Sequence, residues 1–261
     1  MRDSVLRLKD VTVQFGGIKA CEGVSFDVPE GELFAIIGPN GAGKTTVLNA
    51  ITGVYRPNPG AEIVYTGADG TEHSLLGRKP HRIVRHGIAR TFQNLGLFGH
   101  MSVLDNLMLG RYIHQKTGVM HGGLRTRRLV REESEQRAAV ERIIDLLEIQ
   151  QYRWETVGEL PYGVQKRIEL GRVLAMEPDL LLLDEPMAGM TIEEKQDIVR
   201  FIFEIRAELG LTVILIEHDM AVVMSVAERV LALNFGQPIA LGTPADVQAN
   251  DQVVEAYLGA D

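Results

Sequence analysis

The sequence is short of three things: cysteine, positive charge and long apolar runs. Its single cysteine, Cys21, excludes an intrachain disulfide and predicts a reducing compartment. Lysine and arginine together number 27 against 35 aspartates and glutamates. The resulting formal net charge of −8 argues against nucleic acid as the main partner.

Membrane-spanning and secretory segments are also absent from the pattern. No uncharged apolar run approaches the ~18 residues of a membrane-spanning helix. The first residues mix charged and apolar side chains, which is unlike a signal peptide. If the protein works at a membrane, we therefore expect it to do so through another chain.

The chain does have enough length and apolar content for a substantial core. Its 261 residues, of which 45% are hydrophobic, suit one large α/β domain or a core with a small subdomain. We find no internal repeat and no low-complexity tract.

The most specific motif is a glycine-rich stretch that fits the P-loop pattern G-x-x-x-x-G-K-[ST] at every fixed position. An apolar strand, residues 32–37, is expected before it and a helix, residues 46–52, after it. An ordinary glycine-rich turn would need neither flank, so the context favours a phosphate site. The candidate nucleotide-binding residues are Gly38, Pro39, Asn40, Gly41, Ala42, Gly43, Lys44, Thr45 and Thr46.

The chemistry of this loop explains its residue types. Glycines allow successive backbone N–H groups to curl around a phosphate, and the following helix directs its positive end to the same group. Lys44 is predicted to reach the β- and γ-phosphates, and Thr45 to offer its hydroxyl to Mg²⁺.

Polar side chains also follow three other expected strands. Four leucines, residues 180–183, precede Asp184 and Glu185, so we expect Asp184 to hold Mg²⁺ and Glu185 to polarise an attacking water. His218 follows the apolar strand 212–216, at the sheet edge expected to face the γ-phosphate. Gln93 follows a strand that begins at residue 88, and its carbonyl suits Mg²⁺ or the attacking water, although an ordinary loop glutamine would look the same.

The remaining pattern predicts a β-rich start and a helical middle. Alternation over residues 5–13 and 24–28 predicts two antiparallel strands, and residues 56–80 a short exposed hairpin and loop. Residues 95–151 are mainly amphipathic and helical, with Ser102 as an N-cap. A further helix is expected from about residue 166 to 176. Phe15, an aromatic before the P-loop, is consistent with a core residue or with stacking on a purine.

Together these residues resemble the ATP-binding subunits of ABC transporters over essentially the whole chain. The resemblance implies an α/β P-loop NTPase (RecA-like) core, an N-terminal antiparallel β subdomain and an inserted helical subdomain. On this basis residues 1–94 and 177–261 form the β subdomain and core, and 95–176 the helical subdomain. It also makes Phe15 the adenine-stacking aromatic, Gln93 the Q-loop glutamine and His218 the switch histidine.

One motif departs from the family pattern. The signature LSGGQ, which contacts ATP on the partner subunit, is replaced by Leu160, Pro161, Tyr162, Gly163, Val164 and Gln165. In the family the signature serine contacts the γ-phosphate, and proline offers neither a hydroxyl nor an N–H. The resemblance therefore implies a weakened composite site wherever Pro161 faces ATP.

The closest resemblance is to the ATPases of branched-chain amino acid importers, through residues 90–94, 101–107 and 216–220 and the C-terminal stretch 242–259. It implies a head-to-tail homo- or heterodimer that hydrolyses ATP with Mg²⁺, bound to permease subunits and served by a substrate-binding protein. Alternatives are an importer of urea or amides and a non-transport ABC protein. A GTP switch lacks its guanine-reading motif here, since no Asn-Lys-x-Asp occurs.

Overall fold

The computed structural model describes residues 2–91, 95–114 and 127–258, and their contacts divide the chain into two units. Unit 1 contains Met1–Arg90, Asp179–Pro186 and Arg206–Asp261. Unit 2 contains Thr91–Pro178 and Met187–Ile205. Unit 2 therefore also contains residues 187–205, which were expected to belong to the core.

Unit 1 begins with an antiparallel sheet in the order β2-β1-β4-β5. Its strands are β1 (Leu6–Phe15), β2 (Ile18–Val28), β4 (Glu62–Thr66) and β5 (Glu72–Ser74). The two expected N-terminal strands are confirmed, and both are longer than expected. The predicted hairpin is present as β4 and β5. Glu72 and Ser74 of β5 are exposed as expected, whereas β4 pairs with β1 and buries Ile63 and Tyr65.

A second sheet of unit 1 carries the residues predicted to bind nucleotide. Its order is β10-β9-β3-β8-β7-β6, with all neighbours parallel except β10 and β9. The strands are β3 (Leu33–Ile37), β6 (Ile88–Arg90), β7 (Leu180–Asp184), β8 (Thr212–Ile216), β9 (Arg229–Asn234) and β10 (Gln237–Gly242). Every residue of β3, β7 and β8 is buried, as expected of apolar runs in a parallel sheet covered on both faces.

The two faces of this sheet pack against different partners. Phe34 and Ile36 lie in one apolar cluster with the antiparallel sheet and with the apolar side of helix α1 (Lys44–Ile51). Ala35 and Ile37 lie in another, with α7 (Met220–Val226), α8 (Pro244–Gln248) and α9 (Asp251–Leu258). Because side chains alternate along a strand, one buried segment supplies both cores. Packing on both faces of the sheet therefore holds β3 in place.

Short helices complete unit 1. They are α2 (Pro80–Ile83) and the 3₁₀ turn η1 (Val84–His86) before β6. Thr243 caps α8: its hydroxyl accepts from the Asp246 backbone while the Asp246 carboxylate accepts from the Thr243 backbone, which is a capping box.

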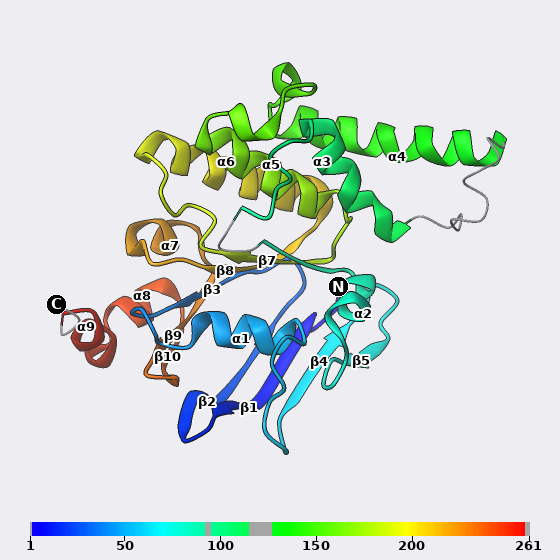
Figure 1. The fold of residues 1–261 in the computed structure, drawn as a ribbon. Helices are drawn as coiled ribbons and strands as arrows, with labels where there is room; N and C mark the ends of the chain where they lie inside the picture. Colours follow the sequence, from blue (N-terminus) through cyan, green and yellow to red (C-terminus); the bar gives the residue numbers. More distant parts are fainter. Residues whose placement is uncertain (1, 92–94, 115–126, 259–261) are drawn as a thin grey trace. The chain divides into compact units, whose positions relative to one another are not determined.

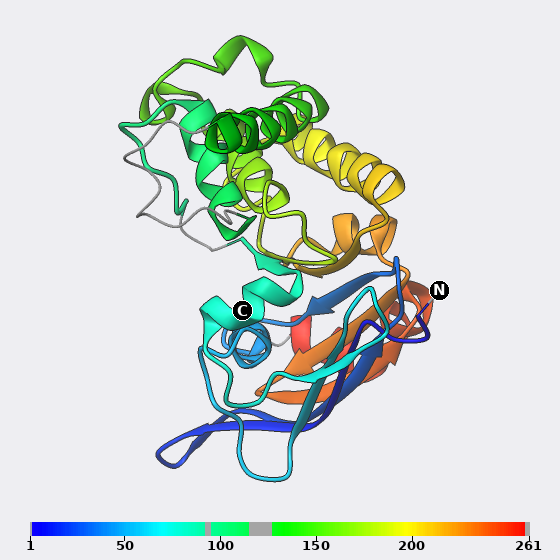
Figure 2. The same cartoon turned by 90° about the vertical axis from the view of Figure 1, so that its right-hand side faces the viewer.

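Unit 2 is helical, and Figures 1 and 2 show its green and yellow helices gathered into one group. Its helices are α3 (Val103–Gly110), α4 (Arg127–Leu146), α5 (Tyr162–Leu174) and the first part of α6 (Ile192–Leu209), with 3₁₀ turns η2 (Arg111–His114), η4 (Gln150–Tyr152) and η5 (Val157–Glu159). Ser102 caps α3 as predicted, by accepting from the Asp105 backbone N–H. Among the helices of the described residues, none is both long enough and apolar enough to cross a bilayer.

Candidate functional site

The glycine-rich loop joins β3 to α1 and holds a backbone shape that only glycine allows at two positions. Gly43 is the N-cap of α1 with φ +96°, and a Cβ there would lie 2.4 Å from the Ala20 carbonyl oxygen. Gly38 has φ +150°, and its Cβ would lie 2.2 Å from the Leu233 carbonyl oxygen. The loop therefore contacts β9 at Gly38 and β2 at Gly43, and a side chain at either glycine would displace it from the strand.

Lys44 lies inside this loop and is only 5% exposed. Its ammonium Nζ donates to the carbonyl oxygens of Gly38, at 2.7 Å, and Pro39, at 3.0 Å. Burial lowers the pKa of Lys44 from its ordinary value, while the carboxylates of Glu185 and Asp184 act in the opposite direction. A cation is therefore held at the centre of the loop, where the sequence predicted a phosphate contact.

Asp184 ends β7 at the same edge of the sheet and is 1% exposed. Its Oδ1 lies 3.5 Å from the Thr45 hydroxyl, and its Oδ2 accepts from Arg90 Nη2 at 2.7 Å. Two of the residues predicted to hold a metal, Thr45 and Asp184, are thus brought together. A hydroxyl and a carboxylate are hard oxygen ligands, and this donor set fits Mg²⁺, which commonly takes one or two carboxylates with phosphate oxygens and waters.

The sequence predicts no role in the site for Arg90, which enters only within residues 90–94 of the family resemblance. Arg90 is the last residue of β6, and its side chain is 7% exposed beside Asp184. Only the pairing of β6 with β7 indicates a role for Arg90, because it places Arg90 near Asp184 at the end of β7. That pairing joins segments about ninety residues apart, which the local pattern does not encode.

Glu185 and His218 follow neighbouring strands. Glu185 has φ +50°, and its backbone N–H donates to the Ile216 carbonyl at 2.9 Å, which turns the chain out of β7. The His218 side chain is 55% exposed and lies 3.7 Å, Nδ1 to Oε2, from the buried carboxylate of Glu217. Since β7 and β8 pair in parallel with Asp184 opposite Ile216, both predicted catalytic side chains leave the same sheet edge.

Phe15 closes β1 and is half-exposed, which does not fit the alternative of a core residue. Its ring meets the ring of Tyr55 edge to face, with centroids 4.9 Å apart and an interplanar angle of 77°. Tyr55 was not singled out in the sequence. An aromatic ring held at its edge keeps a fixed orientation, which suits a stacking platform.

The remaining predicted residues are Gln93 and the signature segment. Gln93 lies outside the described residues. The signature segment lies in unit 2, where α5 begins at Tyr162 and not near residue 166 as predicted. The prediction failed because Pro161 acts as N-cap through its backbone: its carbonyl accepts from the Gln165 N–H at 3.0 Å, and no side chain is needed.

The signature segment is packed against the turn that follows Pro186. The Tyr162 hydroxyl donates to the Ala188 carbonyl at 3.1 Å, and the ring lies against Gly189. A Cβ at Gly163 would lie 2.3 Å from Glu194 Oε1, so glycine is required for this close approach unless Glu194 moves. Tyr162 and Gly163 thus fasten the start of α5 to the start of α6.

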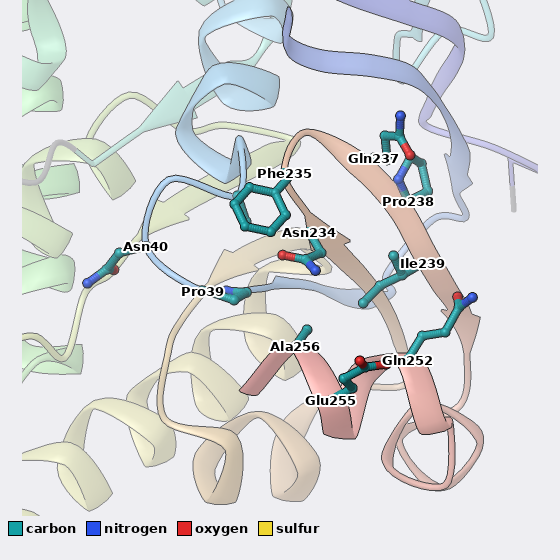
Figure 3. A pocket seen from close by; sticks show the side chains of 11 residues that line it. Pro39, Asn40, Asn234, Phe235, Gln237, Pro238, Ile239, Gln252, Glu255 and Ala256 are labelled. Atoms are coloured by element: carbon teal, nitrogen blue, oxygen red, sulfur yellow. The ribbon is translucent and has the colours of Figure 1, made fainter. Parts of the chain in front are cut away.

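A groove of about 830 Å³ borders the loop within unit 1 (Figure 3). It is lined by Pro39 and Asn40 of the loop, by the β9–β10 turn with Phe235, and by α9 with Gln252 and Glu255. Both polar and apolar side chains line the groove, and most of them are exposed. The glycine-rich loop is therefore accessible to solvent on this side.

Comparison with known proteins agrees with this arrangement. Residues 21–188 match the family described as ABC transporter, and residues 237–261 the family described as branched-chain amino acid ATP-binding cassette transporter. Over 259 residues, 99% of both chains, the sequence is 38% identical to the high-affinity branched-chain amino acid transport ATP-binding protein BraF of Pseudomonas aeruginosa. It is 35% identical to the corresponding protein LivG of Escherichia coli strain K12, again over 99% of both chains.

Solved structures give the same answer. The ADP conformation of MJ1267, an ATP-binding cassette of an ABC transporter, superposes with a TM-score of 0.83 at 30% identity, covering 98% of this chain and 99% of that one. A nucleotide-free ATP-binding cassette from an ABC transporter superposes with a TM-score of 0.82 at 29% identity, covering 97% and 98%. The chain belongs to the ABC transporter family, and it is an ATPase cassette of that family. The predicted fold class is confirmed, and a non-transport protein is not favoured.

Proposed function

We propose that this chain hydrolyses ATP to drive the import of branched-chain amino acids. The support is that the relatives matched over nearly their whole length are named for branched-chain amino acid transport. In this proposal the chain forms a dimer, homo- or hetero-, binds membrane permease subunits at the cytoplasmic face of the inner membrane, and is served by a substrate-binding protein.

The places of Lys44, Thr45, Asp184, Glu185 and His218, which follow or end β3, β7 and β8 of one sheet, support the roles proposed here. Lys44 and the loop N–H groups bind the phosphates, and Phe15 stacks on the base. Thr45, Asp184 and Gln93 would hold Mg²⁺ through oxygen atoms, and the ion would supply positive charge beside the phosphates. Glu185 polarises the attacking water, and His218 contacts the γ-phosphate from the neighbouring strand.

The signature segment, residues 160–165, is proposed to face the ATP held by the partner subunit. The helical unit is proposed to carry motion to the permease. Both proposals rest on family resemblance, and Pro161 makes the contact weaker than a serine would.

The observation that carries the ATPase assignment is the buried Lys44 in a glycine loop with Thr45, Asp184 and Glu185 beside it. The test measures phosphate release by the purified chain, by Lys44→Ala and by Lys9→Ala, an exposed β1 lysine that matches the charge change. Loss of a preorganised charged donor should lower turnover about 10²-fold or more. Equal activity in all three chains would refute the assignment.

The substrate is tested by uptake. The chain should be reconstituted in proteoliposomes with the permeases encoded beside it and their binding protein. ATP-dependent uptake of labelled leucine, isoleucine or valine supports the proposal. Uptake of urea or a short amide in place of these amino acids would assign the alternative importer class.

A further inference from the structure

Arg90 connects three elements of unit 1 through one buried guanidinium. Its Nη2 donates to Asp184 Oδ2 at 2.7 Å, at the end of β7. Its Nη1 donates to Asn49 Oδ1 at 2.7 Å and to Thr52 Oγ1 at 3.3 Å, both on α1. The strand that supplies Asp184 and the helix that supplies Lys44 and Thr45 are thus joined by a side chain from β6.

The two oxygens of the Asp184 carboxylate have different partners. Oδ2 is held by Arg90, whereas Oδ1 lies on the side of the Thr45 hydroxyl, 3.5 Å away. A carboxylate held at one oxygen by a planar, charged donor has little freedom to rotate. Its other oxygen then has a fixed direction, toward Thr45.

Burial makes this pairing costly to break. The Arg90 side chain is 7% exposed and that of Asp184 is 1% exposed. A buried carboxylate that loses a cationic partner must recruit water or rotate. Either response would move the oxygen that faces Thr45.

We propose that Arg90 is a positioning residue for the metal–nucleotide site: it fixes the Asp184 carboxylate and α1 in register, so that Asp184 Oδ1 and Thr45 Oγ1 are presented together to a divalent cation. The proposal rests on the function proposed above, in which these two residues hold Mg²⁺. Arg90 itself touches neither the ion nor the nucleotide in this role.

The test compares nucleotide affinity with and without the metal. A fluorescent ATP analogue is titrated into the whole chain in excess Mg²⁺ and in excess EDTA, and the ratio of the two dissociation constants is the Mg²⁺ gain. In Arg90→Gln this gain should fall about tenfold, the size expected when a charge-assisted hydrogen bond is lost. Affinity in EDTA should stay within about threefold, since the loop and Lys44 are not altered.

A second readout reports the metal ligands directly. With Mn²⁺ in place of Mg²⁺, the electron paramagnetic resonance spectrum of the nucleotide complex should broaden in Arg90→Gln, because Asp184 no longer holds one orientation. Arg90→Lys should recover part of the gain, since an ammonium keeps the charge but cannot hold both Asp184 and Asn49 in the same geometry.

Two variants separate positioning from general destabilisation. Arg2→Gln removes another largely buried arginine of unit 1, which pairs with Glu30, and should keep the full Mg²⁺ gain. Asn49→Ala removes an anchor of Arg90 and keeps both charges, so it should lower the gain less than Arg90→Gln does. It also serves if Arg90→Gln does not fold. An unchanged gain in Arg90→Gln and Asn49→Ala, or an equal loss in Arg2→Gln, would overturn the proposal.

Asp184→Asn in the same assay separates the positioning role of Arg90 from the binding of the metal by Asp184. If Asp184→Asn loses the gain while the Arg90 variants keep it, the positioning role alone is wrong. If Asp184→Asn keeps the full gain, the assignment of Asp184 to the metal fails, and the positioning role fails with it.

Discussion

Glu185 is held in a conformation that most residues avoid. Its φ of +50° lies in the left-handed region, and its N–H is fixed to Ile216 at the end of the neighbouring strand. This turn takes the carboxylate out of the strand direction, next to the buried Asp184. Sequence pattern placed Glu185 correctly after a buried strand, but the backbone strain arises from the pairing with β8 and is not visible in the pattern.

Replacing Glu185 with glutamine should preserve ATP binding and abolish most turnover. The amide keeps the size of the side chain but cannot accept a proton from water, and a general base is worth roughly 10²–10⁴ in rate. With ATP and Mg²⁺ the variant should accumulate as a dimer on gel filtration. Near-normal phosphate release by this variant would remove Glu185 from the role of general base.

The strained backbone gives a second prediction at this position. Glu185→Gly should be more stable than Glu185→Ala by about 1 kcal/mol, because glycine adopts the left-handed region without the steric cost of a Cβ. Both variants lose the carboxylate equally and should be equally inactive. Urea unfolding of the two proteins measures the difference, and equal midpoints would mean that the turn relaxes when the carboxylate is absent.

At the scale of elements, α5 begins earlier than the local sequence pattern predicts. The segment Pro161-Tyr162-Gly163 looks like a loop, since proline and glycine both disfavour a helix interior. Here the proline stands at the N-cap and the glycine faces Glu194 of α6, so both fit a helix that begins early. The helix begins early because the Pro161 carbonyl accepts from the Gln165 N–H and because Tyr162 is bonded to Ala188; the second contact is tertiary.

The N-terminus of α5 lacks a side-chain cap, and this supplies a prediction. Pro161→Ser should stabilise the chain relative to Pro161→Ala by about 1 kcal/mol, because a serine N-cap accepts from a free backbone N–H. In the Glu185→Gln background the serine should also tighten ATP-driven dimerisation, by up to about tenfold, if it restores the signature contact to the partner's nucleotide. Analytical ultracentrifugation at several ATP concentrations measures this.

Pro161→Ala is the matched control, since it removes the proline ring and adds no hydroxyl. Equal dimerisation of the serine and alanine variants would mean that the missing hydroxyl is unimportant here. Tighter dimerisation of both would assign the effect to the proline ring.

At the scale of the molecule, buried strands were predictable and their order was not. The apolar runs at 180–183 and 212–216 gave β7 and β8 almost to the residue, because a doubly covered parallel strand needs no polar face. Whether β6 would pair with β7, or β4 with β1, depends on contacts between distant segments. Those pairings place Arg90 beside Asp184 and bury Ile63 and Tyr65 in a hairpin that was expected to be exposed.

The whole nucleotide site also predicts loose selectivity for the base. The proposed contacts are mainly to phosphates and metal, and Phe15 offers only a ring face, which every base matches. Affinities for ATP and GTP should therefore agree within about tenfold, or 1.4 kcal/mol. Isothermal titration of both nucleotides tests this, and Phe15→Ala should weaken both to a similar extent. A large preference for GTP would contradict the proposed site.

The internal bonds of Lys44 bear on the speed of nucleotide loading. Its ammonium is held by the carbonyls of Gly38 and Pro39, and Gly43 and Gly38 lie against the carbonyls of Ala20 and Leu233. An arriving phosphate exchanges one set of oxygen partners for another and orders little new backbone. The association rate should then depend on diffusion and charge, and differences in affinity among nucleotides should appear in how long each one stays.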